Sequence, residues 1–172
     1  SAALDDSVAL ISFMLVNNET GACYDVKKLF GIAKRRCPEV LTHCDAVQGF
    51  LHVPFTVGEL GVDLLSVSGH KVHAPKGVGA LYIKDGVRIL PQTFGGGQEK
   101  GIRSGTEAVP SICGFGAAVK AMQDPAESLP KMQELADYCR AQLAAVDGVV
   151  LNSAPDALPY IVNFSTMSIR SE

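Results

Sequence analysis

Short apolar runs alternate with helical patterns along the first half of the chain. Three of these runs carry almost no charge, and they are residues 8–16, 40–44 and 62–67. Runs of this kind are typical of strands buried on both faces of a parallel sheet. A fourth run, 79–83, indicates another buried strand, and the turn residues after it predict a hairpin leading to a strand at 87–90.

Helical spacing appears between and after these runs. Residues 25–36 place apolar side chains on one side of a helix, and Asp25 stands where an N-cap belongs. The glycine-rich segment 95–105 predicts a loop, and Thr106 is expected to cap a helix that runs to residue 122. Strands that alternate with helices predict an α/β fold with crossover connections.

The pattern changes after residue 123. Residues 129–146 indicate an amphipathic helix, and 149–151 and 160–164 indicate strands. Two strands and one helix bury little apolar surface on their own. We therefore expect two domains, a larger one in residues 1–123 and an incomplete smaller α+β domain in residues 124–172.

Composition and charge narrow the function classes. The chain has 172 residues, is 47% apolar and has a net charge of −3, so it should fold and is not expected to bind nucleic acid. Five cysteines without a CxxC pair fit a reducing compartment, and the N-terminal apolar run is too short to span a membrane. We expect a cytoplasmic protein without a membrane segment and without a metal site.

Polar residues cluster just after three of the predicted strands. In an open α/β sheet, ligands bind outside the carboxyl ends of the strands, so three such clusters predict one site. A single polar residue at a strand end is more often a turn or a cap, and only the recurrence favours a site. The clusters are Asn17 and Asn18, then His43, Asp45 and Gln48, then Ser68, His70 and Lys71.

Lys71 and Asp45 suggest a particular chemistry. A lysine amine forms Schiff bases with aldehydes, and a buried setting would favour its neutral, nucleophilic form. If the aldehyde is pyridoxal phosphate, a carboxylate such as Asp45 keeps the ring nitrogen protonated and the ring becomes an electron sink. Hydroxyl and imidazole donors would suit the phosphate. A lysine and an aspartate at this spacing are nevertheless a weak signal alone.

Five motifs in order make the signal specific. They are NNETG at 17–21, HCDAVQ at 43–48, SVSGHK at 66–71, PKGVGALY at 75–82 and GGGQEKGIRSGTE at 95–107. With these motifs the chain resembles the cysteine desulfurases and their selenocysteine lyase relatives, which are class V aminotransferase-fold enzymes that use pyridoxal phosphate. The resemblance runs from about residue 8 to residue 122, and more weakly to Phe164. It implies a fold type I transferase with a mostly parallel sheet.

The resemblance also implies roles for individual residues. Lys71 matches the lysine that holds the cofactor and moves the α-proton of the substrate. Asp45 matches the aspartate on the pyridine nitrogen, and Gln48 matches the residue near the phenolic oxygen.

The remaining matches concern the phosphate group and the substrate. Ser68 and His70 match phosphate contacts, and Asn18 matches a polar residue near cofactor and substrate. Thr106 matches a residue that reaches the phosphate of the neighbouring subunit, which implies a homodimer.

The activity implied is the removal of sulfur from L-cysteine, which yields L-alanine and a persulfide for an acceptor protein and iron–sulfur cluster assembly. The family's catalytic cysteine and carboxylate-binding arginine would lie beyond Glu172, and its ring-stacking histidine before Ser1. We therefore expect these 172 residues alone to be inactive in sulfur transfer. Three alternatives stay open: a truncated non-catalytic dimerisation or binding domain, a selenocysteine lyase, and a related aminotransferase or β-lyase.

Overall fold

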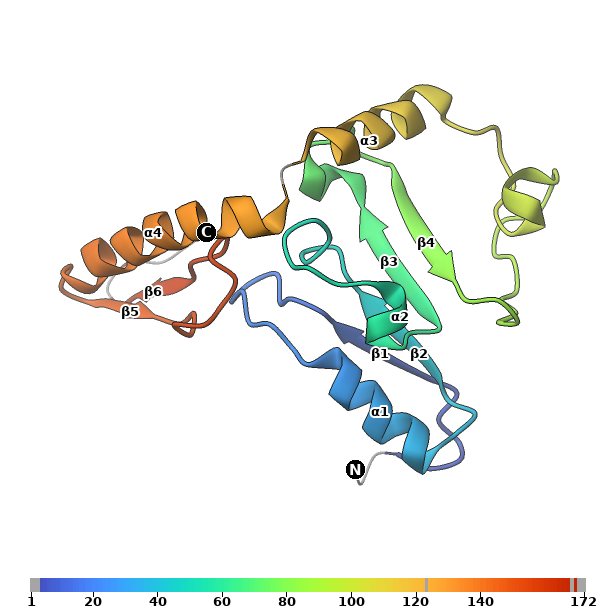
Figure 1. The fold of residues 1–172 in the computed structure, drawn as a ribbon, viewed down its shortest axis with the longest axis horizontal. Helices are drawn as coiled ribbons and strands as arrows, with labels where there is room; N and C mark the ends of the chain where they lie inside the picture. Colours follow the sequence, from blue (N-terminus) through green and yellow to red (C-terminus); the bar gives the residue numbers. More distant parts are fainter. Residues whose placement is uncertain (1–3, 123, 168, 170–172) are drawn as a thin grey trace.

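A four-stranded sheet forms the centre of the larger part of the molecule. The computed structural model describes residues 4–122, 124–167 and 169. The sheet has the order β1-β2-β3-β4, in which the first three strands are parallel and β4 is antiparallel (Figure 1). Its strands are β1 (Leu10–Met14), β2 (Leu41–Asp45), β3 (Leu64–Ser68) and β4 (Gly79–Ile83). The predicted α/β class with a mostly parallel sheet is confirmed.

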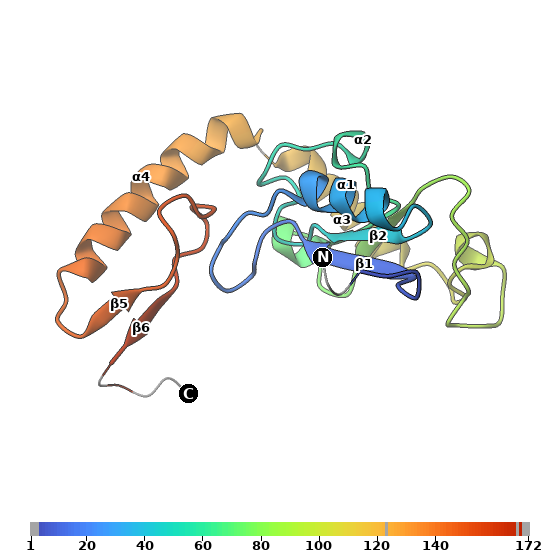
Figure 2. The same cartoon turned by 90° about the horizontal axis from the view of Figure 1, so that it is seen from below.

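Two helices cover one face of this sheet (Figure 2). Helix α1 (Val26–Arg36) has the predicted cap, because the Asp25 side chain accepts a hydrogen bond from Lys28 N at 3.0 Å. Phe30 of α1 is 2% exposed and meets Phe13 of β1 with ring centroids 5.7 Å apart. The four-residue helix α2 (Val57–Leu60) begins with a complete capping box and was not predicted from the sequence.

The opposite face of the sheet is much more open. On this face Leu10 and Ser12 of β1 and Leu81 of β4 are exposed. The prediction that 8–16 and 79–83 are buried on both faces is therefore wrong. The reason is that α1 and α2 pack on one face only, and that β1 and β4 are the two edge strands of the sheet.

The segment after β4 forms an arm that projects away from the sheet (Figure 1). Residues 87–90 form no strand, so that prediction is wrong; a turn in which Val87 N donates to Lys84 O directs the chain into the arm instead. The arm contains one short 3-10 turn, η2 (Gln98–Gly101), and ends at helix α3 (Val109–Ala121). The N-cap of α3 is Ala108, without a side-chain cap, so Thr106 does not cap this helix as expected.

A second unit follows, made of helix α4 (Pro125–Ala144) and a two-stranded antiparallel sheet of β5 (Val149–Leu151) and β6 (Phe164–Thr166). The helix starts earlier than predicted because Asp124 caps it. The strand expected at 160–164 is wrong except for its last residue, since the register pairs Leu151 with Phe164.

The predicted division into residues 1–123 and 124–172 stays a prediction, and residues 1–3, 123, 168 and 170–172 of these two ranges lie outside the described residues. In the part of the chain that the structure describes, not one helix has both the length and the apolar character that a membrane crossing needs.

Candidate active site

The carboxyl ends of β1, β2 and β3 meet at one edge of the sheet. Leu15 N donates to Asp45 O at 2.9 Å, and Ala46 N donates to Ser66 O at 3.0 Å. These bonds continue the parallel register to the last residues of the strands. The three predicted polar clusters follow these strand ends, so the structure gathers them at a common edge as the sequence suggested.

Asp45 is the last residue of β2 and is half-buried. Its Oδ1 atom accepts a hydrogen bond from Val47 N at 3.0 Å, a short local bond that fixes the carboxylate and occupies one of its two oxygens. The preceding residue, Cys44, faces the covered side of the sheet and is fully buried. Burial raises the pKa of the Cys44 thiol to about 12, and the charge of Asp45 adds to the effect. Cys44 is therefore not a thiolate nucleophile.

Ser68 ends β3 and leads into the short 3-10 turn η1 (Gly69–Val72), which presents His70 and Lys71. The Ser68 hydroxyl and His70 Nδ1 are hydrogen-bonded at 2.7 Å, so these two side chains act together. Both His70 and Lys71 are exposed. Lys71 therefore lacks, in this chain, the buried setting that would favour its neutral amine.

Close contacts of Gly69 with Ala74 and Val78 hold η1 in place. A Cβ atom on Gly69 would lie 3.0 Å from both Ala74 Cβ and Val78 Cγ1, so no larger residue fits without a shift. Gly69 N donates to Val78 O at 2.9 Å, and Ala74 N donates back to Gly69 O at 3.0 Å. The turn is therefore a fixed platform for the Lys71 side chain rather than a loose connection.

The other two clusters are turns next to this platform. Asn17 organises the turn after β1, since its Oδ1 atom accepts from Glu19 N at 3.0 Å and from Thr20 N at 2.9 Å. Asn18 is exposed, and its Nδ2 donates to the Glu19 carboxylate at 2.7 Å. Gln48 is half-buried in the turn after β2.

Helix α3 supports the same edge from outside. It packs on η1, and Phe115 of α3 meets Phe50 edge-on with centroids 6.3 Å apart. The turn that contains Gln48 and the turn that contains Lys71 are therefore braced by one helix.

Thr106 lies apart from these residues. Because β4 is antiparallel, the arm leaves the sheet at the end opposite to the carboxyl ends of β1, β2 and β3. The arm is held by its own bonds, in which Ser104 Oγ donates to Gly96 O at 2.7 Å and Gly105 N donates to Gln98 Oε1 at 3.1 Å. Thr106 is exposed at the end of this arm. Six of the seven predicted residues therefore follow the carboxyl ends of three neighbouring strands, whereas Thr106 belongs to the arm.

The donors and acceptors at the edge fit pyridoxal phosphate by their chemistry. The carboxylate of Asp45 suits a protonated ring nitrogen, and the exposed primary amine of Lys71 suits an aldehyde. The bonded pair Ser68 and His70 supplies a hydroxyl and an imidazole for a phosphate. The roles of the individual residues stay predictions.

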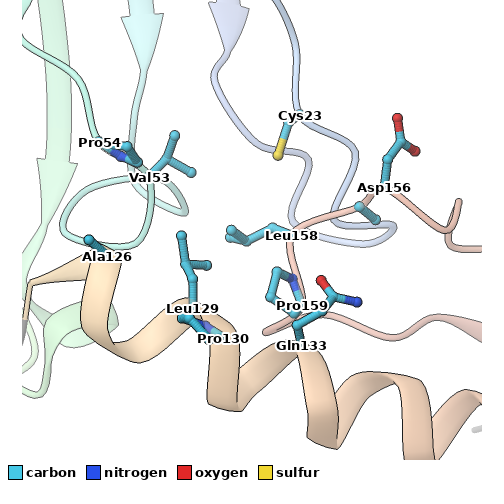
Figure 3. A pocket seen from close by; sticks show the side chains of 11 residues that line it. Cys23, Val53, Pro54, Ala126, Leu129, Pro130, Gln133, Asp156, Leu158 and Pro159 are labelled. Carbon is cyan, nitrogen blue, oxygen red and sulfur yellow. The ribbon is translucent and has the colours of Figure 1, made fainter.

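A separate pocket of about 530 Å³ lies between α4 and the loops of the larger part (Figure 3). Its wall is mostly apolar, with Leu129 and Leu158 facing the space and Cys23, Gln133 and Asp156 at the rim. Burial raises the pKa of the Cys23 thiol, which opposes thiolate chemistry there. None of the predicted site residues lines this pocket.

Sequence reasoning missed two polar arrangements. Asp63, at the start of β3, is 4% exposed and pairs with Lys34 Nζ at 2.7 Å. A charged residue inside an apolar run was the signal that could have revealed it. The second is a line across the open face, in which the ring of His43 bonds Ser12 on one side and Ser66 on the other. Its signal was a histidine two residues before Asp45, on the same face of the strand.

Comparison with known proteins identifies the class that this fold and edge define. The aminotransferase class-V family matches residues 1–172, so the chain belongs to that family.

Within the class, the similarity is to cysteine desulfurases. A cysteine desulfurase IscS of Dictyoglomus turgidum is 42% identical over 99% of this chain, and the match covers 43% of that protein. A solved structure of a NifS-like protein has a TM-score of 0.86 at 37% identity and covers 98% of this chain and 47% of its own. A structure described as SspA in complex with cysteine has a TM-score of 0.77 at 32% identity, covering 92% of this chain and 44% of its own. The chain therefore spans less than half the length of the relatives it matches, and its resemblance to the desulfurases is confirmed.

Proposed function

We propose that this chain is part of a pyridoxal-phosphate-dependent cysteine desulfurase. The observation that carries the proposal is the gathering of Asp45, Ser68, His70 and Lys71 at one edge of a class V aminotransferase sheet. The similarity to proteins named cysteine desulfurases supports the reaction class. A relative whose structure is described as a complex with cysteine supports L-cysteine as the substrate.

Each residue has a defined task in this proposal. Bound pyridoxal phosphate would supply an electron sink for the bond changes at the substrate. Lys71 holds the aldehyde through its amine and moves the proton at the substrate Cα. Asp45 keeps a proton on the ring nitrogen, because a carboxylate beside that atom stabilises the charged form. Gln48 contacts the phenolic oxygen.

Binding of the phosphate and the substrate falls to the turns around Lys71 and Asp45. Ser68 and His70 donate to the phosphate, and Asn18 lies near cofactor and substrate. Residues 1–123 are then part of the large cofactor-binding domain, and 124–172 the beginning of the small domain.

The net reaction moves one sulfur atom. The carbon–sulfur bond of L-cysteine breaks, the sulfur becomes bonded to a cysteine thiolate as a persulfide, and L-alanine leaves. None of the five cysteines of this chain is assigned that nucleophilic role. The persulfide would pass to an acceptor protein, and iron–sulfur cluster assembly is the proposed destination.

A homodimer is part of the proposal. Thr106 stands at the end of an arm that leads away from Lys71 of its own chain, so it would serve the phosphate site of a partner. Apolar side chains on the same arm support this arrangement, since Leu90 is 84% exposed and Phe94 is 81% exposed. Exposed apolar residues in such a group mark an interaction surface. A chain that dimerises and binds partners without catalysis is the second candidate, and the same apolar residues favour it.

The test is the binding of pyridoxal phosphate to the purified chain. We expect the visible absorption band of a lysine-bound aldehyde, with loss of that band in Lys71→Ala. The matched control is Lys76→Ala, which removes another exposed lysine five positions along the chain and should leave the band unchanged. Absence of the band in the parent chain, or its persistence in Lys71→Ala, would refute the assignment and favour the non-catalytic reading.

A further inference from the structure

The open face of the sheet carries a line of three hydrogen-bonded side chains from three neighbouring strands. Ser12 Oγ of β1 lies 2.7 Å from His43 Nδ1, and His43 Nε2 lies 3.2 Å from Ser66 Oγ of β3. The strand register places Ser12 directly opposite His43. The imidazole ring therefore spans β2 and ties both of its neighbours to it.

The last member of this line is also a neighbour of the candidate catalytic carboxylate. The register pairs Ser66 with Asp45, and paired residues of parallel strands point to the same face. Neighbouring strands are about 4.8 Å apart, so a rotation of the Asp45 side chain brings its carboxylate within reach of Ser66 Oγ while His43 keeps its bond to that oxygen. The bond from Val47 N occupies only one oxygen of Asp45.

The neutral ring can take part in this line in two ways, and a protonated ring donates at both nitrogens and so also holds Ser66 as an acceptor. A neutral imidazole donates at one nitrogen and accepts at the other. If Nδ1 carries the proton, Ser66 has to donate to Nε2 and has no proton left for Asp45. If Nε2 carries the proton, Ser12 donates to Nδ1, Ser66 accepts from Nε2, and the Ser66 proton is free.

We propose that His43 is a positioning residue for Asp45. Its Nε2–H group holds Ser66 Oγ as an acceptor and thereby directs the Ser66 hydroxyl proton to the Asp45 carboxylate. This role rests on the proposed function, in which Asp45 must stay ionised opposite a ring nitrogen. A hydrogen bond donated to the charged form of a carboxylate favours ionisation, and the line Ser12, His43, Ser66 supplies one from the open face of the sheet.

Other titratable groups at this edge belong to different elements. His70 and Lys71 stand on η1, and Cys44 faces the covered side of the sheet. Substitutions at Ser66 leave His70, Lys71 and Cys44 in place, so a change in the carboxyl signal of Asp45 can be attributed to the Ser66 hydroxyl.

The experiment uses nuclear magnetic resonance on the purified chain without cofactor. Two-bond proton–nitrogen spectra of histidine-labelled chain report which nitrogen of His43 is protonated, with His43→Gln identifying its signals. We expect the Nε2–H form at neutral pH. Carboxyl carbon spectra at neutral pH then report the hydrogen bonding of Asp45, and Ser66→Ala should shift the Asp45 carboxyl signal away from its position in the parent.

Two comparisons make the result specific. Ser66→Thr keeps the hydroxyl and should restore the parent position of the Asp45 carboxyl signal. Asp63, which precedes β3 and takes its bonds from Thr42, serves as an internal control whose carboxyl signal stays unchanged. The Nδ1–H form, or an Asp45 carboxyl signal that is the same in Ser66→Ala and the parent, would overturn the proposal. Both readouts are independent of pyridoxal phosphate, so failure of Lys71 to bind the aldehyde would overturn the proposed function and not the hydrogen-bonded line.

Discussion

Replacement of Asp63 tests how the larger part of the molecule is held together. Its carboxylate accepts hydrogen bonds from Thr42 N at 3.0 Å and from Thr42 Oγ1 at 3.1 Å. Lys34 of α1 pairs with it at 2.7 Å, and Lys84, just after β4, lies 3.5 Å away. One buried charge therefore joins β2, β3, α1 and the end of β4, and its loss should weaken all four contacts.

The expected loss of stability depends on which hydrogen-bond and ion-pair partners of Asp63 can be solvated instead when the carboxylate is removed. Thr42 is fully buried, so Asp63→Ala leaves its N–H group without an acceptor, and hydrogen bonds to a charged group are worth about 1.5–3 kcal/mol each. Lys34 is 35% exposed and can turn to solvent, so its ion pair adds about 1 kcal/mol or less. We expect Asp63→Ala to lower the free energy of unfolding by about 3 kcal/mol, and the isosteric Asp63→Asn by roughly half of that.

The same residue gives the stability a defined pH dependence. Burial by itself would raise the pKa of Asp63, but the bonds from Lys34 and Thr42 outweigh burial and hold the pKa below its usual range. A folded-state pKa below the unfolded value of about 3.9 means that the stabilisation is fully present above that pH. It is lost as the pH falls through the folded-state pKa. The difference between parent and Asp63→Asn should therefore shrink on acidification.

Urea denaturation followed by circular dichroism measures these free energies, first at neutral pH and then at a series of acidic values. Asp85→Ala is the matched control, because Asp85 is an exposed aspartate in the turn after β4. It should unfold at the parent's urea concentration. Equal midpoints for Asp63→Ala and the parent, or a difference between Asp63→Asn and the parent that stays constant with pH, would refute the reasoning.

Two further predictions concern close packing and thiol reactivity. Gly79→Ala places a Cβ atom 2.5 Å from Val67 O and should lower the free energy of unfolding by about 1–3 kcal/mol. The Cβ atom of Gly116→Ala, inside α3, meets nothing within 4 Å, so this variant should raise the free energy of unfolding by roughly 0.5–1 kcal/mol. Denaturation curves measure both changes, and similar effects of the two variants would contradict the packing argument. Cys44 is buried and its pKa is raised to about 12, so it should resist alkylation in the folded chain while the exposed Cys113 and Cys139 react. Mass spectrometry of the digested protein identifies the labelled cysteines. Labelling of Cys44 as early as the exposed cysteines would disprove its burial.

The elements that the sequence predicted best are those whose signal is local. Helix α1 has both an amphipathic pattern and a capping aspartate, and it begins and ends within a residue of the prediction. Runs such as 62–67 also indicated strands correctly. The strand predictions that failed depend on contacts between distant parts of the chain, because a short apolar run such as 87–90 does not reveal whether a partner strand lies beside it. In the same way, the position of β6 is set by its register with β5 and not by its own most apolar residues.

For the site, the sequence predicted a common edge but not what surrounds it. Polar residues that follow parallel strands are brought together by strand direction alone, which is why Asp45 and Ser68 could be placed from the pattern. Asp63 inside an apolar run could have indicated a buried charge, but its partner could not be foreseen, since Lys34 is twenty-nine positions away on α1. The bond between Ser12 and His43 likewise depends on the register of β1 and β2, which no periodicity encodes.

The reversal of β4 explains why one predicted residue stands apart. A fourth parallel strand would have delivered the following segment to the edge where Lys71 lies, but an antiparallel strand delivers it to the opposite end. The arm that carries Thr106 is fixed by bonds within itself, and α3 then brings the chain back to pack on η1. Among the described residues, no hydrogen bond joins the arm to η1 or to the carboxyl ends of β1, β2 and β3. If Thr106 contacts a phosphate as we propose, a second copy of the chain would supply that phosphate, and the exposed Leu90 and Phe94 of the arm are the residues that we propose for the contact between copies.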